Sequence, residues 1–159
     1  MSKGFIIGID PGASGAMVVF DERDRLQIFP WTDKADFCEE LANIVHACEA
    51  ENVPVFAAVE QVGGFIKGNP ATGSSMFNFG NNAGFIEGVL MAYGIPMEFV
   101  RPQRWQKEMH CNSTEKGAAH KRELKEQAQR LFPKVKVTLK NADALLIAEW
   151  LRRKKREHL

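Results

Sequence analysis

Short apolar runs and helical spacings alternate along the chain, and together they predict an α/β fold. Residues 4–10 are almost continuously apolar and end in a carboxylate, which is typical of a central strand buried on both faces. Turn residues 11–15 follow, and residues 16–20 are apolar again, so the two runs predict a hairpin. Further strands are predicted at residues 25–30, where Pro30 ends an edge strand, and at residues 55–60 and 96–100.

Helical spacing of apolar residues fills the remaining segments, apart from one long loop. Residues 61–76 are rich in Gly, Asn, Pro and Ser and predict that loop, whose length points to a functional role. Helices are predicted at residues 33–51, 78–93, 102–109, 116–131 and 141–155. The order of elements predicts a mixed five-stranded sheet, three antiparallel strands followed by parallel ones, flanked by helices. Right-handed crossovers would place the two strands that end in Asp10 and Glu60 side by side.

The length and composition indicate one intracellular domain. A chain of 159 residues with 45% hydrophobic residues can bury one core, so we expect a single domain over residues 1–159. Its three cysteines, Cys38, Cys48 and Cys111, lack zinc-site spacing and are expected to be reduced thiols. No apolar stretch is long enough for a membrane span, and the N-terminus has no signal-peptide pattern, so a soluble protein without a membrane partner is expected.

Charge is divided unevenly between the two parts of the chain. Residues 1–100 hold 5 basic and 13 acidic side chains, a net charge of −8, while residues 101–159 hold 16 and 7, a net charge of +9; together they give the +1 of the whole chain. An acidic part that binds metal beside a basic part that neutralises phosphates would suit a nuclease. Solvated helix faces would give the same distribution.

Three acids form a candidate metal site. Asp10 and Glu60 each close an apolar strand, and neighbouring strands lie about 4.8 Å apart, so the two carboxylates are expected at one edge of the sheet. Asp143 follows Asn141, a predicted N-cap, and falls in the first turn of the last helix, where it would at least complement the helix dipole. Carboxylate oxygens are the preferred ligands of Mg²⁺, and two such ions can support phosphodiester hydrolysis.

These acids lie within an ordered set of motifs that resembles the RuvC-type Holliday junction resolvases, in particular those of phages and chloroplasts. The matching segments are residues 8–16 (GIDPGASGA), 59–60 (VE), 79–84 (FGNNAG), 102–105 (PQRW) and 142–148 (ADALLIA). The set spans nearly the whole chain and is more specific than any one segment.

The resemblance implies an RNase H-like fold and a homodimer that uses Mg²⁺ or Mn²⁺, with two ions in each active site and no nucleotide cofactor. It implies metal binding by Asp10, Glu60 and Asp143, and paired symmetric nicks in four-way DNA junctions that leave 5′-phosphate and 3′-hydroxyl ends. The expected location is the cytoplasm, at the nucleoid, or the host cytoplasm for a phage-encoded protein.

One position departs from the family pattern. The family commonly has a further acid, or a histidine, three residues before the final Asp, and Lys140 stands there. Either three carboxylates suffice, or another group such as Glu149 or His120 contributes. A lysine at this position would also suit a phosphate contact.

Basic and aromatic residues supply candidates for DNA contact. Phe65, in the Gly-rich loop, resembles the aromatic residue that these resolvases insert into the junction, although it could equally fold into the core. Lys121 resembles the family's basic residue near the scissile phosphate and is therefore a catalytic candidate. The candidates for phosphate contact are Lys67, Lys107, Lys116, Lys121, Arg122, Lys125 and Lys140. The terminal run Arg152–Arg156 would either reach a duplex arm or fray as a tail.

A face for dimerisation is predicted on the helix near residues 77–93. This segment is apolar on more than one side and has Gly80, Gly84 and Gly88 at intervals of four, which would let two helices approach closely. The alternative is that the helix packs only on its own sheet. A two-fold symmetric substrate favours the symmetric dimer.

Other functions share parts of this pattern. Sugar kinases and Hsp70-like ATPases also open with an Asp followed by a Gly-rich hairpin, but they need two such domains. A non-catalytic junction-binding protein would keep the basic part without needing the three acids. A broader nuclease would also cut flaps, Y-forks or RNA hybrids.

Overall fold

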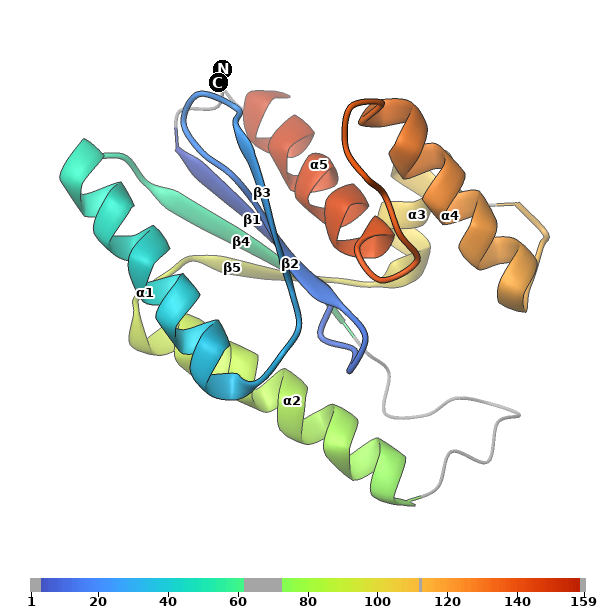
Figure 1. The fold of residues 1–159 in the computed structure, drawn as a ribbon, viewed down its shortest axis with the longest axis horizontal. Coiled ribbons are helices and arrows are strands. Elements are labelled where there is room, and N and C mark those ends of the chain that lie inside the picture. The colour runs from blue at the N-terminus through green and yellow to red at the C-terminus, as the bar shows by residue number, and fades with distance from the viewer. Residues whose placement is uncertain (1–3, 62–72, 112, 158–159) are drawn as a thin grey trace.

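The computed structural model describes residues 4–61, 73–111 and 113–157, and within them the strands form one mixed sheet. The strands are β1 (Phe5–Ile9), β2 (Ala16–Phe20), β3 (Leu26–Pro30), β4 (Val55–Glu60) and β5 (Met97–Val100). Their order is β3-β2-β1-β4-β5 (Figure 1). Strands β1, β2 and β3 pair antiparallel, whereas β4 is parallel to both β1 and β5. The predicted mixed sheet is confirmed, with the two acid-ended strands adjacent.

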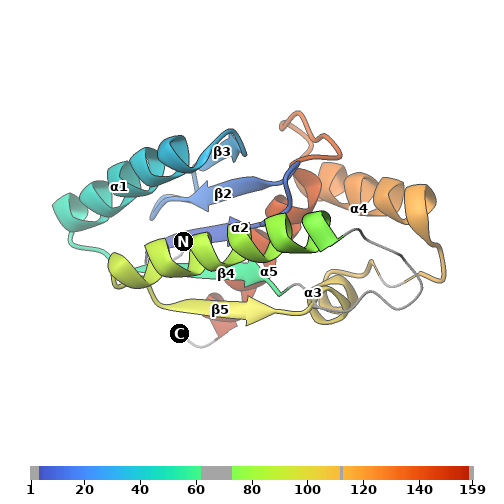
Figure 2. The same ribbon diagram turned by 90° about the horizontal axis from the view of Figure 1, so that it is seen from below.

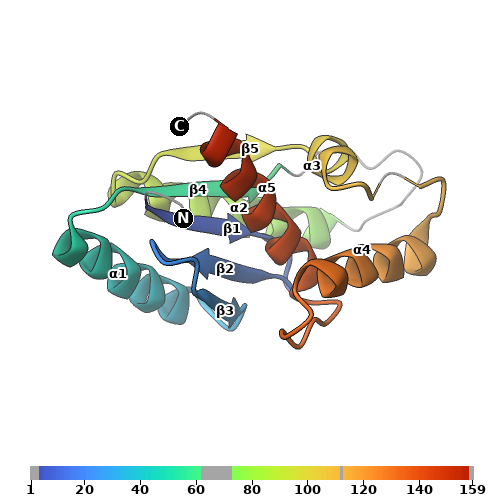
Figure 3. The ribbon, with the colours of Figure 1, turned by 90° about the horizontal axis from the view of Figure 1, so that it is seen from above.

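Helices cover both faces of this sheet (Figures 2 and 3). They are α1 (Lys34–Glu51), α2 (Gly73–Ala92), α3 (Pro102–Glu108), α4 (Gly117–Leu131) and α5 (Ala142–Glu157). Buried side chains of α1 and α2 pack on one face, and those of α3, α4 and α5 pack on the other.

Strand β1 is buried from both sides, as its apolar run predicts. Phe5, Ile7 and Ile9 belong to the core beneath α1 and α2, whereas Ile6 belongs to the core beneath α5. This alternation follows from the two-residue period of a strand. It explains why the sequence of β1 is continuously apolar and not alternating.

Pro30 is the last residue of the edge strand β3, paired with Ala16. The next residue, Trp31, donates its backbone N–H inward to Gly15 O at 3.0 Å. Because successive N–H groups along a strand point to opposite sides, an N–H at position 30 would point away from β2. Proline therefore removes no hydrogen bond from the sheet here.

Two local predictions need correction. Helix α2 begins at Gly73, five residues before the predicted start at Asn78, because the Gly-Ser composition of its first turn resembles a loop. Asn141 precedes α5, but its side chain does not cap the helix: Oδ1 accepts from Thr138 N and Nδ2 donates to Lys136 O.

All three cysteines are free thiols, as predicted. None of the described helices has the length and apolar character needed to cross a membrane.

Candidate active site

Two carboxylates stand side by side at the ends of the parallel strands β1 and β4. Ile9 lies opposite Val59 in the register, so the next residue on each strand, Asp10 or Glu60, stands at the same level of the sheet. Both side chains are half-buried. The arrowheads of β1, β4 and β5 in Figure 2 lie at one edge, which is the edge where open α/β sheets bind ligands.

The turn after β1 holds Asp10 in place. Its backbone N–H donates to Ala16 O at 3.0 Å, and its Oδ1 accepts from Gly12 N at 3.0 Å. The return of the chain passes so close that a Cβ at Gly15 would lie 2.2 Å from Asp10 O, which only glycine avoids. Asn82 of α2 braces the same turn by donating to Pro11 O at 2.6 Å.

Asp143 reaches the site because α5 lies directly on β1. A Cβ at Gly8 would be 2.4 Å from Ala148 N and 2.6 Å from Ala144 O, so the two backbones touch at this glycine. Asp143 lies in the first turn of α5, one residue before Ala144. The absence of a side chain at position 8 therefore lets α5 approach β1 closely enough to bring Asp143 near the end of that strand.

Glu60 has a fixed partner in α3. The indole Nε1 of Trp105 donates to Glu60 Oε2 at 2.9 Å, and Trp105 is fully buried. Trp105 was noted in the sequence only as part of a motif, and its bond to Glu60 was not predicted. The only sequence signal for this role is its place in the PQRW segment.

The pKa values show that the three carboxyl groups interact. Burial, followed by the nearby charges of Asp10 and Asp143, raises the pKa of Glu60 to about 8. Burial and Asp10 raise the pKa of Asp143 to about 6. Burial also raises the pKa of Asp10, against the opposing effects of the Gly12 N–H and the Lys121 ammonium. Acids whose pKa values are raised by burial and by one another's charge are typical of functional sites.

This donor set fits a hard divalent cation. A cation would relieve the repulsion among Asp10, Glu60 and Asp143, and carboxylate oxygens are the ligands that Mg²⁺ prefers. Among the described residues, no group of three or more acidic, histidine or cysteine side chains is already arranged as a metal-binding cluster. The assignment of metal ligands therefore rests on the chemistry and proximity of the three acids.

Two residues of α4 lie near these acids. The ammonium of Lys121 lowers the pKa of both Asp10 and Asp143, so it lies within electrostatic range of both. His120 also acts on Asp143, while its ring nitrogens lie 3.1 Å from Gln106 Oε1 and 3.1 Å from Glu123 Oε2.

Of the two alternatives for a fourth ligand, only His120 is near the acids. Glu149 is instead paired with Arg152 and Arg153, at 2.6 and 2.8 Å.

Most of the predicted phosphate contacts are accessible on the surface. The exposed ones are Lys107, Lys116, Lys121, Arg122 and Lys140, and Lys125 is half-buried. Phe65 and Lys67 lie outside the described residues. Lys134 and Lys136 were not predicted; they are exposed in the loop between α4 and α5, close in the chain to Lys140. Their signal in the sequence was their alternation with valines, which resembles a strand.

Within the described residues, the terminal basic run Arg152–Arg156 is not a frayed tail, and its contact with a duplex arm stays a prediction. It is helical through Glu157, and its arginines and Lys154 pair with acids of α5 itself, of β5 and of the turn between β2 and β3. The pairs are Arg152 with Asp24 and Glu149, Arg153 with Glu149, Lys154 with Glu98, and Arg156 with Asp24. Part of the positive charge of residues 101–159 is therefore neutralised within the molecule, away from the acidic site.

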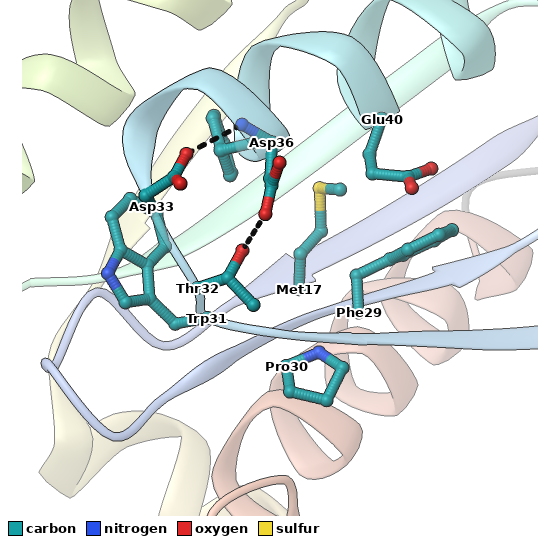
Figure 4. A pocket seen from close by; sticks show the side chains of 9 residues that line it. Met17, Phe29, Pro30, Trp31, Thr32, Asp33, Asp36 and Glu40 are labelled. Atoms are coloured by element: carbon teal, nitrogen blue, oxygen red, sulfur yellow. Dashed lines mark hydrogen bonds between the residues drawn. The ribbon is translucent and has the colours of Figure 1, made fainter.

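Two hollows are lined in part by Trp31 and Asp33, just before α1. A cleft of about 590 Å³ separates the turn after β1 from the start of α2 and includes Ala13, Trp31 and Asn82 in its lining. A smaller hollow of about 30 Å³, at the start of α1, has room for only about one water (Figure 4). In it Asp36 accepts from Thr32 at 2.6 Å, and the Asp36 N–H donates to Asp33. The candidate carboxylates line neither hollow.

The arrangement of strands and helices is similar to that of solved RuvC structures. Thermus thermophilus RuvC has a TM-score of 0.56 and 15% identity to this chain, covering 97% of this chain and 96% of that one. The structure described as T. thermophilus RuvC in complex with Holliday junction substrate has a TM-score of 0.58 and 16% identity, covering 95% and 96%. No protein-family model and no curated protein matches the sequence. The predicted RuvC-type fold is confirmed.

Proposed function

We propose that this protein is a metal-dependent endonuclease that resolves four-way DNA junctions. The observation that carries the proposal is the meeting of Asp10, Glu60 and Asp143 at the carboxyl edge of the sheet. The fold supports it, because a protein of the same fold has been solved with a Holliday junction substrate. The product would carry 5′-phosphate and 3′-hydroxyl ends.

Different residues of the chain would bind the metal ions and the DNA. Asp10, Glu60 and Asp143 would hold Mg²⁺, with Mn²⁺ as a substitute and two ions in each site. When bound, such ions supply the activated water and the stabilisation of the departing oxygen that phosphodiester hydrolysis needs. Lys121 would place its ammonium against the scissile phosphate, since it already lies near Asp10 and Asp143. The exposed lysines and arginine of α3, α4 and the loop before α5 would contact the backbone of the arms.

The test compares the wild type with Asp10→Asn on a synthetic four-way junction, a flap and a linear duplex. With Mg²⁺ the wild type should nick the junction in pairs and leave the linear duplex intact. Asp10→Asn should reduce cleavage to background while keeping junction affinity in EDTA. Binding without cleavage by the wild type would indicate a non-catalytic junction-binding protein. Equal cleavage of flap and junction would indicate a broader branched-DNA nuclease.

Paired nicks also require two active sites, and α2 has a surface that would serve a two-fold dimer. Phe77 and Met91 are 70% and 65% exposed, and no atom lies within 4 Å of a Cβ built at Gly84. We therefore propose that α2 packs against α2 of a second copy. Gly84→Arg should convert a dimer to a monomer in sedimentation, whereas Ala35→Arg on exposed α1 should not. A monomeric wild type at micromolar concentration would exclude this dimer.

A further inference from the structure

Two of the three carboxylates are held by a donor within the chain, and in different ways. Asp10 accepts from the Gly12 N–H of its own turn, which is a local contact. Glu60 accepts from the side chain of Trp105, 45 residues away on α3. Among the described residues, no hydrogen bond is found for the Asp143 carboxylate. Trp105 is therefore a residue distant in the sequence that holds the Glu60 carboxylate in position.

The indole is well suited to orient a carboxylate. It has one N–H donor and no acceptor, so it can bind only one oxygen and cannot turn to offer an alternative. Its bond to Oε2, at 2.9 Å, fixes the rotation of the Glu60 carboxylate, while Oε1 has no hydrogen bond within the described part of the chain. The fully buried Trp105 ring is locked by packing in the core beneath α5, so the donor itself does not move.

We propose that Trp105 is a positioning residue for the metal site, holding the Glu60 carboxylate so that Oε1 is the oxygen presented to Mg²⁺. This inference rests on the proposed function. Hydrogen-bond partners behind metal ligands commonly change metal affinity or activity by about 10–100-fold when they are removed. Trp105 would thus contribute to metal affinity without touching the metal or the DNA.

The chain contains a matched control for this bond. Trp150 is also buried, at 2% exposed, and its Nε1 donates to a glutamate, Glu108. Glu108 is exposed at the end of α3 and is not one of the three acids. Trp105→Phe and Trp150→Phe therefore remove the same kind of hydrogen bond and leave cavities of similar size, one at the acidic site and one away from it.

The experiment titrates Mg²⁺ against the melting temperature of the wild type and both variants, without DNA. We expect the Mg²⁺ concentration for half-maximal stabilisation to rise by about 10-fold or more in Trp105→Phe and to stay at the wild-type value in Trp150→Phe. Junction affinity in EDTA should be the same in both variants. Equal Mg²⁺ requirements in the two variants would overturn the inference.

A second measurement uses the wild type and does not depend on the folding of Trp105→Phe. The chain has three tryptophans, so ¹⁵N labelling gives three indole N–H signals. The Trp105 signal is identified as the one that persists in both Trp31→Phe and Trp150→Phe. It should shift over the same Mg²⁺ range that raises the melting temperature, and an unchanged signal would contradict the proposed role.

Failure of this inference can be separated from failure of the proposed function. If the wild type neither gains stability from Mg²⁺ nor cuts the junction, the nuclease proposal itself fails. If the wild type does both and the two tryptophan variants behave alike, only the role of Trp105 is excluded.

Discussion

Gly8 of β1 and Ala148 of α5 touch through their backbones, at a point where a Cβ on residue 8 would lie 2.4 Å from Ala148 N. This contact joins the strand that ends in Asp10 to the helix that begins with Asp143. The separation between Asp10 and Asp143 therefore depends on Gly8, which has no side chain.

Gly8→Ala should force α5 away from β1 and so affect both stability and activity. Overpacking of this kind costs about 1–3 kcal/mol of the free energy of unfolding. The displaced Asp143 should also weaken Mg²⁺-dependent stabilisation and junction cleavage. Urea unfolding and Mg²⁺ thermal titration measure the two effects. Gly73→Ala, where no atom lies within 4 Å of the added Cβ, is the control: it should not lower the free energy of unfolding and should leave the Mg²⁺ effect unchanged.

The raised carboxyl pKa values predict that the metal-free protein loses stability as the pH rises. The pKa of Asp143 is raised to about 6 and that of Glu60 to about 8, so the folded state binds protons more tightly than the unfolded chain. The free energy of unfolding in EDTA should therefore fall between about pH 4 and pH 8 and level off above that range.

Asp143→Asn tests this directly, because it removes one of the repelling charges. In EDTA at pH 8 it should raise the free energy of unfolding by about 1–3 kcal/mol, and at pH 4 by much less. Adding Mg²⁺ should reverse the order, since the wild type would gain stability that the variant cannot. A wild type less stable at pH 4 than at pH 8 in EDTA would contradict the electrostatic description.

Lys121 should matter for cleavage more than for junction affinity. Lys121→Met removes the ammonium near Asp10 and Asp143, and we expect kcat to fall by about 100-fold. The neighbouring Arg122→Met removes an exposed charge that acts on neither acid, so it should mainly weaken binding and reduce its salt dependence. Single-turnover cleavage and binding at several salt concentrations distinguish the two. Equal loss of kcat in both variants would remove the special role of Lys121.

Asp24 should stabilise the protein by pairing with the C-terminal end of α5. It bonds to Arg152 at 3.1 Å and to Arg156 at 2.7 Å, and these contacts hold its pKa below the usual value despite some burial. Asp24 has a φ of 60°, which asparagine also tolerates, so Asp24→Asn changes the charge without straining the backbone.

We expect Asp24→Asn to cost about 1–2 kcal/mol of the free energy of unfolding at pH 7. A carboxyl group with a lowered folded pKa stabilises the protein above its unfolded pKa, and this contribution is lost as the pH falls through the folded pKa. The difference between variant and wild type should therefore be present at pH 7 and shrink at an acidic pH below 3.8, the ordinary pKa of the aspartate carboxyl group. Urea unfolding at both pH values measures it, and a difference that persists in acid would point to a cause other than charge.

The sequence predicted the elements of the fold whose signals are local. The continuous apolar run of β1, the acid after it and the acid at the end of β4 are visible without any contact, and the crossover rule placed them side by side. The roles of Asp10, Glu60 and Asp143 as metal ligands and of Lys121 at the phosphate stay predictions.

Features that depend on pairing between distant residues could not be predicted in the same way. The bond from Trp105 to Glu60 and the ion pairs of Asp24 with α5 join residues 45 or more positions apart. The sequence around one residue of such a pair does not indicate which residue is its partner. The start of α2 at Gly73 was missed for another reason: glycine and serine favour loops locally, whereas here they form the first turn of a helix.

Pro30 has a consequence for how copies of this protein can associate. Its missing N–H faces the outer side of β3, so a further strand arriving at that edge would find one donor absent from the ladder. Growth of the sheet from one molecule into the next is therefore disfavoured at the β3 edge, whereas the opposite edge strand, β5, contains no proline.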